Sequence, residues 1–95
     1  MENQQESPKP HALDMEEAIL GALMLEQDAL TNVIDVLKTE YFYKPEHRLI
    51  FDAIRQLYYD EHPVDILTVV NKIKELGNLE KIGGAYYISQ LTNHA

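Results

Sequence analysis

Apolar residues recur along this chain at intervals of three and four, the spacing that places them on one face of an α-helix. The clearest stripes lie in residues 28–37, 45–59, 66–76 and 84–91. Residues 18–25 are apolar on every face, which is typical of a buried central helix. No segment alternates over enough residues to indicate a strand. The pattern predicts an all-α fold, a compact orthogonal bundle of five or six short helices.

Capping residues indicate where these helices begin and end. Asp14, Asp28 and Asp65 each precede an apolar stripe, and a carboxylate there can accept hydrogen bonds from the free N–H groups of a first turn. Pro45 suits the first turn of the third helix, where its missing N–H is not needed. Gly77 stands where a C-cap glycine belongs, after the fourth stripe.

Gly21 interrupts the most apolar helix, although glycine there costs about 1 kcal/mol relative to alanine. Its presence predicts that another helix approaches closely at this point. The N-terminal residues are polar and include two of the four prolines, so they cannot offset the entropy of ordering. We expect a disordered lead-in over residues 1–12 and one helical domain over residues 13–95, which is within the usual size of a domain.

The charge balance weighs against several functions. Lys plus Arg number 8 and Asp plus Glu number 16, giving a formal net charge of −8. Nucleic-acid binding needs clustered Lys and Arg, so this domain is not expected to bind DNA strongly. The absence of cysteine excludes disulfides and thiolate sites. No apolar run approaches the roughly 20 residues of a membrane span, and no signal peptide is visible, so no membrane partner and a cytoplasmic location are expected.

Residues that could carry chemistry do not form a recognisable site. The chain has four histidines, and no two of them stand at the spacing of a close metal-ligand pair. We interpret His47 as a packing or capping residue rather than a ligand. The pair Gly83-Gly84 lacks the other parts of a nucleotide fingerprint, and no glycine-rich phosphate loop is present. We therefore predict no catalytic residue, no metal site and no cofactor within these residues.

Tyrosine is the more informative residue type. Tyr58-Tyr59 and Tyr86-Tyr87 are adjacent on predicted helices, where neighbours point about 100° apart, so one member of each pair is hard to bury. Two interpretations stay open. The rings are half-packed at the surface, or they form a partner surface, for which tyrosine gives rigid contact area. Tyr86 and Tyr87 are the candidate partner-contact residues, although Tyr87 also lies on an apolar stripe.

Four stretches, in this order, resemble the N-terminal domain of bacterial replicative hexameric helicases, the DnaB family. They are the Glu-led apolar run of residues 17–25, the Phe-Tyr…His…Ile-Phe pattern of 42–51, the Pro-Val-Asp-x-x-Thr turn of 63–69 and the Gly-x-Leu…Gly-Gly…Tyr-Ile…Leu ending of 77–91. Together they cover about residues 11–95. Tyr41 departs from the pattern, because the family more often has an acidic residue before Phe-Tyr.

The resemblance implies a larger parent protein with specific partners. The parent would be an ATP-driven helicase that unwinds duplex DNA 5′ to 3′ at the replication fork, with ATP and Mg²⁺ in a RecA-like motor domain that this chain lacks. Family N-terminal domains form a trimer-of-dimers collar in the hexamer and recruit the C-terminal domain of primase. Other parts of the parent bind DNA. The chain is then expected to be a fragment, monomeric or weakly associating, with no catalytic site of its own.

The sequence leaves three other functions to consider. A winged-helix DNA-binding module is loosely suggested by residues 65–77 and the following tyrosines, but this helix offers only Lys72 and Lys74 and no arginine. A free-standing adaptor domain would follow if the reading frame closed soon after Ala95. A small hydrolytic enzyme built on Asp, Glu and His has no constellation in its favour.

Overall fold

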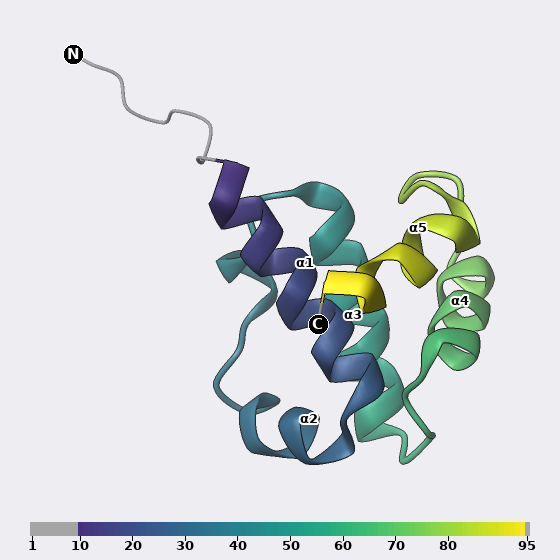
Figure 1. The fold of residues 1–95 in the computed structure, drawn as a ribbon. Coiled ribbons are helices and arrows are strands. Elements are labelled where there is room, and N and C mark those ends of the chain that lie inside the picture. Colours follow the sequence, from purple (N-terminus) through teal and green to yellow (C-terminus); the bar gives the residue numbers. More distant parts are fainter. Residues whose placement is uncertain (1–9, 95) are drawn as a thin grey trace.

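The computed structural model describes residues 10–94, and all regular structure within that range is helical. The elements are α1 (Pro10–Leu25), α2 (Gln27–Val33), the 3-10 segment η1 (Thr39–Tyr41), α3 (Pro45–Tyr59), α4 (Ile66–Glu75), α5 (Gly84–Leu91) and the 3-10 segment η2 (Thr92–His94). In Figure 1, α1 lies in front of α3, α2 closes the lower end, and α4 and α5 form one flank. The predicted all-α fold of short helices is confirmed.

The three C-terminal helices begin and end where the local signals placed them. Pro45 opens α3. Asp65 caps α4, since its carboxylate accepts a hydrogen bond from the Thr68 N–H at 2.9 Å while the Thr68 hydroxyl accepts one from the Asp65 N–H at 2.9 Å. Gly77 follows α4 with φ of +80°, the left-handed conformation that terminates a helix and favours glycine. Short-range chemistry therefore determines this half of the chain.

The first helix begins earlier than predicted. It starts at Pro10, so Asp14 lies inside the helix and is not its cap. The expected lead-in was therefore drawn too long at residues 10–12, and the rest of it, residues 1–9, lies outside the described part of the chain. The physical signal is Pro10 itself, because proline has a backbone angle suited to the first turn and needs no N–H there.

The second helix is shorter than predicted. It runs over Gln27–Val33 with Glu26 at its N-cap, so Asp28 lies in the first turn and does not cap it. The N–H of Val36 then bonds the carbonyl of Val33 at 3.0 Å, a tightened turn that ends the helix. Four β-branched residues within six positions, 31–36, lower the helix propensity here, which explains the early end.

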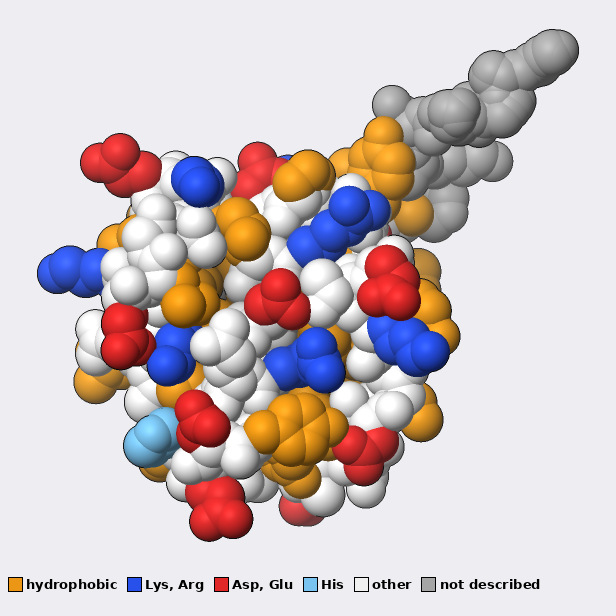
Figure 2. Space-filling model, turned by 180° about the vertical axis from the view of Figure 1, so that it is seen from behind, with side chains coloured by type: hydrophobic (Ala, Val, Ile, Leu, Met, Phe, Trp, Pro, Cys, Tyr) orange, Lys and Arg blue, Asp and Glu red, His pale blue; other side chains and the backbone are white. Residues whose placement is uncertain are grey.

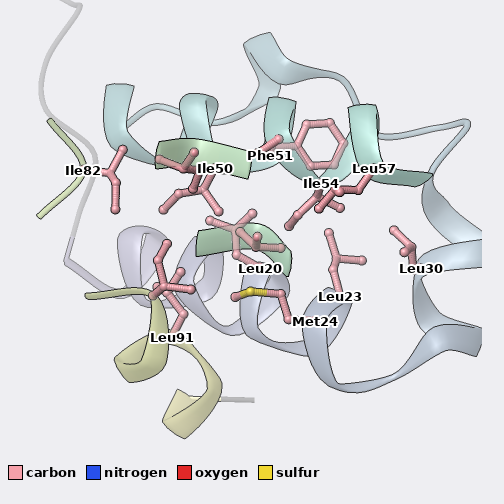
Figure 3. Close-up of a cluster of buried hydrophobic side chains, with 14 of the residues drawn as sticks. Leu20, Leu23, Met24, Leu30, Ile50, Phe51, Ile54, Leu57, Ile82 and Leu91 are labelled. Carbon is pink, nitrogen blue, oxygen red and sulfur yellow. The ribbon is translucent and has the colours of Figure 1, made fainter. Parts of the chain in front are cut away.

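The hydrophobic core lies between α1 and α3, and one or two buried residues from each of α2, α4 and α5 complete it (Figure 3). The buried residues labelled there are Leu20, Leu23, Met24, Leu30, Ile50, Phe51, Ile54, Leu57, Ile82 and Leu91. The expectation that residues 18–25 form a helix buried on every face is wrong, because Leu25 is 56% exposed and Ile19 is 36% exposed. Helix α1 contacts α2, α3, α5 and η2, which leave part of its apolar surface facing solvent. None of the helices within residues 10–94 is long and apolar enough to cross a bilayer.

Gly21 marks the point where the end of the described chain crosses α1. A Cβ atom at this position would lie 2.8 Å from the carbonyl carbon of Leu91 and 3.1 Å from the Cα atom of Thr92, closer than real Cβ atoms pack. The predicted close approach is therefore confirmed, and the element that approaches is the junction of α5 and η2. This contact helps to hold α5, and with it both candidate tyrosines, against α1.

Candidate functional site

A chain of polar side chains joins α1, α3, α5 and η2, from the buried His47 to the exposed His94. His47 is fully buried, with Nδ1 at 2.7 Å from Glu16 Oε1 and Nε2 at 2.7 Å from the Tyr87 hydroxyl. The Tyr87 hydroxyl also lies 3.1 Å from Glu17 Oε2, and His94 Nε2 lies 3.2 Å from Glu17 Oε1. We call these five residues the polar lock. Both ring nitrogens of His47 have partners, as buried polar groups require.

The loop before α3 is tied to the same cluster. Glu16 accepts hydrogen bonds from the backbone N–H of Tyr43 at 2.7 Å and of Lys44 at 3.5 Å. The Lys44 ammonium donates to the Tyr87 hydroxyl at 3.4 Å and lies 5.0 Å from the centre of its ring. These contacts use the polar atoms of the cluster to connect helices within the domain.

The histidines take no part in a metal site in this region. Within residues 10–94, no group of three or more His, Asp or Glu side chains is placed to hold a metal ion. His47 is a hydrogen-bonded core residue, which agrees with its interpretation as a packing residue. Sequence reasoning missed its partners, Glu16 and Tyr87. They stand 31 and 40 positions from His47 in sequence, and no spacing rule reports such contacts.

Tyr87 turns inward, and its environment changes its acidity. Burial, and then the negative charge of Glu17 and its hydrogen bond, raise the pKa of the Tyr87 phenol well above its usual value of 10. The folded domain therefore keeps this proton at a pH where the unfolded chain releases it. Since the unfolded state then binds fewer protons, the contribution of Tyr87 to stability is present below about pH 10 and is lost as the pH rises further.

Replacing Tyr87 by phenylalanine is expected to reduce the loss of folding stability at alkaline pH. The free energy of unfolding of the unmodified domain should fall between about pH 9 and pH 11, and that of Tyr87→Phe should fall less steeply, although it starts lower because the hydroxyl contacts are gone. Urea denaturation followed by circular dichroism at both pH values measures the two slopes. Tyr41→Phe, at an exposed position, is the control and should keep the slope of the unmodified domain. If the free energy of unfolding fell equally with pH in all three proteins, the raised pKa of Tyr87 would be contradicted.

Tyr86 points the other way and is 74% exposed. It borders a shallow apolar groove of about 500 Å³ between α4 and α5, which we call the α4/α5 groove. Its lining residues are Ile66, Leu67, Val70, Ala85, Tyr86 and Ser89. Leu67 on the opposite wall is 68% exposed, so two large apolar side chains face solvent together. Two large exposed apolar side chains beside an apolar groove make it a candidate protein-binding site.

The predicted division within each tyrosine pair is confirmed. Tyr59 and Tyr86 are exposed, while Tyr58 and Tyr87 are partly buried. The two candidate contact residues are therefore in different environments: Tyr86 lies at the groove and Tyr87 belongs to the polar lock. The signal was present in the sequence, because Tyr87 lies on the apolar stripe of its helix and Tyr86 does not.

The surface offers little support for the DNA-binding alternative. Figure 2 shows the face opposite to that of Figure 1, where acidic and basic side chains alternate without forming a continuous basic area. A winged helix also needs strands for its wing, and residues 10–94 form none. The fourth helix, proposed in that alternative as the recognition helix, instead contributes one wall of the apolar groove.

Comparisons with known proteins agree with this geometry. Residues 8–95 match the model of a family described as the DnaB-like helicase N terminal domain. The chain is 39% identical over 88 residues to the replicative DNA helicase DnaB of Leifsonia xyli subsp. xyli, covering 93% of this chain and 19% of that protein. It is 38% identical over 82 residues to the replicative DNA helicase DnaB of Mycobacterium leprae, covering 86% of this chain and 14% of that protein.

A solved structure shows a similar fold. The crystal structure of the N-terminal domain of DnaB helicase from Mycobacterium tuberculosis matches with a TM-score of 0.84 and 36% sequence identity, over 87% of this chain and 60% of that one. The chain thus spans less than a fifth of the length of the two curated relatives named above.

Proposed function

The chain belongs to the DnaB-like helicase N-terminal domain family, and from this membership we propose that it is the N-terminal assembly and primase-docking domain of a replicative DNA helicase. The whole protein would unwind duplex DNA 5′ to 3′ at the replication fork, using ATP and Mg²⁺ bound in a motor domain. It would work in the bacterial cytoplasm as a hexamer whose N-terminal domains form a trimer-of-dimers collar. The observation that carries the proposal is the match over residues 8–95, supported by relatives named as replicative DNA helicases.

A docking role fits the chemistry of the described surface. The polar lock connects helices, and the exposed α4/α5 groove is apolar with a tyrosine at its edge. Tyrosine and aliphatic residues at a rigid surface are the usual anchors of protein interfaces. A domain with a net charge of −8 is poorly suited to bind DNA through phosphates, so partner recognition is the more natural use of this surface.

The docking role is tested by titrating the domain with the cognate primase C-terminal domain. We expect weak but saturable binding by isothermal titration calorimetry, and we expect Tyr86→Ala to lower the affinity about tenfold, as the loss of an aromatic anchor worth about 1.4 kcal/mol would. Because the Tyr86 side chain is exposed, this variant should keep its thermal stability.

Tyr59→Ala is the matched control. Tyr59 is 53% exposed and ends α3, away from the lining of the groove, so its removal should leave the affinity unchanged. Absence of primase binding at high micromolar concentration would contradict the docking role. A salt-dependent mobility shift of labelled duplex DNA would favour the winged-helix alternative instead.

A further inference from the structure

The α4/α5 groove offers no sheet edge to which an extended peptide could add a strand. Its walls are two helices, and residues 10–94 contain no strand. The Ser89 hydroxyl donates to the carbonyl of Tyr86 at 2.7 Å, so it is already engaged. An occupant must therefore satisfy its own backbone hydrogen bonds while it buries apolar side chains. A helix does this, and an extended strand, which needs a sheet edge, does not.

The groove is free of charge in a chain of which a quarter of the residues are charged. None of its six lining residues is an Asp, Glu, Lys, Arg or His, and α5 contains no Asp, Glu, Lys or Arg. Burying this surface would therefore desolvate no charge, and a buried charge without a partner is the main penalty that such an interface avoids. The occupant should present aliphatic or aromatic side chains here.

Lys74 lies at the end of the apolar stripe of α4. Lys74 follows Leu67 by seven residues and Val70 by four, so it continues their stripe on α4 about two turns, or about 10 Å, beyond Leu67. Lys72 pairs with Glu75 at 3.1 Å, whereas the exposed Lys74 makes no ion pair within residues 10–94. An unpaired ammonium next to an apolar groove favours a carboxylate on whatever binds there.

We propose that the α4/α5 groove receives an amphipathic helix of a partner protein, with apolar residues on one stripe and a carboxylate about two turns along it that pairs with Lys74. This inference rests on the proposed docking function and names the chemistry of the segment that docks. The ion pair fixes the direction of the bound helix, because apolar contacts alone would accept either orientation.

Charge reversal at Lys74 tests the proposal, with the cognate primase C-terminal domain as the probe. We expect Lys74→Glu to weaken binding about three- to tenfold by calorimetry, mostly at low salt, because it replaces attraction with repulsion. Reversing each exposed helical Asp or Glu of the primase domain to Lys in turn should identify one substitution that restores binding to Lys74→Glu. Lys38→Glu is the matched control, with the same change of charge at an exposed site remote from the groove, and should not alter the affinity.

The outcomes separate this inference from the docking role itself. If the unmodified domain binds primase but Lys74→Glu binds equally well or better, the groove chemistry is wrong and the docking role stands. If the unmodified domain does not bind primase, both fail. If Leu67→Gln leaves primase binding intact but abolishes a concentration-dependent increase in sedimentation coefficient, the groove binds a second copy of this chain, which overturns the choice of occupant.

Discussion

Replacing Gly21 by alanine is expected to destabilise the domain by about 2 kcal/mol or more. The new methyl group would overlap the backbone of Leu91 and Thr92, which cannot rotate away as a side chain could, so the α5–η2 junction would have to move off α1. Overpacking costs about 1–3 kcal/mol and occasionally more, and a clash with backbone atoms belongs at the upper end, about 3 kcal/mol or more. Subtracting the gain of about 1 kcal/mol from removing a glycine from a helix leaves about 2 kcal/mol or more. For a domain of this size the midpoint of thermal unfolding should fall by roughly 8 °C or more.

Gly84→Ala separates this steric effect from that of simply removing a glycine. Gly84 has φ of +83° but no neighbour within 4 Å of a Cβ atom, so alanine there costs only the backbone strain of about 1–2 kcal/mol. Thermal and urea denaturation of both variants should rank Gly21→Ala as the less stable. If Gly21→Ala were as stable as the unmodified domain, the close contact with Leu91 would not exist in solution.

Replacing His47 by leucine is expected to destabilise the domain by about 3 kcal/mol. Leucine nearly fills the same space, so the loss comes from hydrogen bonding rather than from a cavity. Glu16 would lose its contact with Nδ1 and Tyr87 would lose its contact with Nε2, each at 2.7 Å, and partly buried polar groups without a partner cost about 1–3 kcal/mol, more when charged. Urea denaturation near neutral pH measures the change.

Two further variants show whether the loss arises in the polar lock. His62→Leu changes an exposed histidine whose side chain makes no hydrogen bond within residues 10–94, and it should alter stability by no more than about 0.5 kcal/mol. The double variant His47→Leu with Tyr87→Phe should be less destabilised than the sum of its parts, by about 1 kcal/mol, because both remove the same contact. Additive effects would mean that the two side chains do not interact.

These contacts connect stability to the surface that we propose for docking. Helix α5 has eight residues, too few to be stable alone, so its position depends on what holds it to the rest of the fold. The Tyr87 hydroxyl holds it to α3 and α1, and the contact at Gly21 holds its C-terminal end. With Tyr87 fixed inward, Tyr86 projects beside the α4/α5 groove.

The sequence by itself determined most of the local structure. Pro45, Asp65 and Gly77 ended or began helices where they were expected to, because capping and turn chemistry act within a few residues. The stripe of α5 already separated Tyr87 from Tyr86, since helical periodicity decides which side chains share a face. The close approach at Gly21 was also visible, because a glycine inside an apolar helix is costly without such a contact.

Only the tertiary structure decided what lies against each face. Periodicity indicates that a face is buried but does not say what buries it, so the crossing of Gly21 by the α5–η2 junction could not be foreseen. The same holds for the polar lock, whose contacts to His47 join residues 31 and 40 positions apart. The exposed apolar residues of α1 have the same cause: the composition allowed burial all round, but the elements that contact α1 leave part of its surface uncovered. Contacts between residues far apart in sequence determine which element covers each helix face, and these contacts depend on the packing of the whole chain.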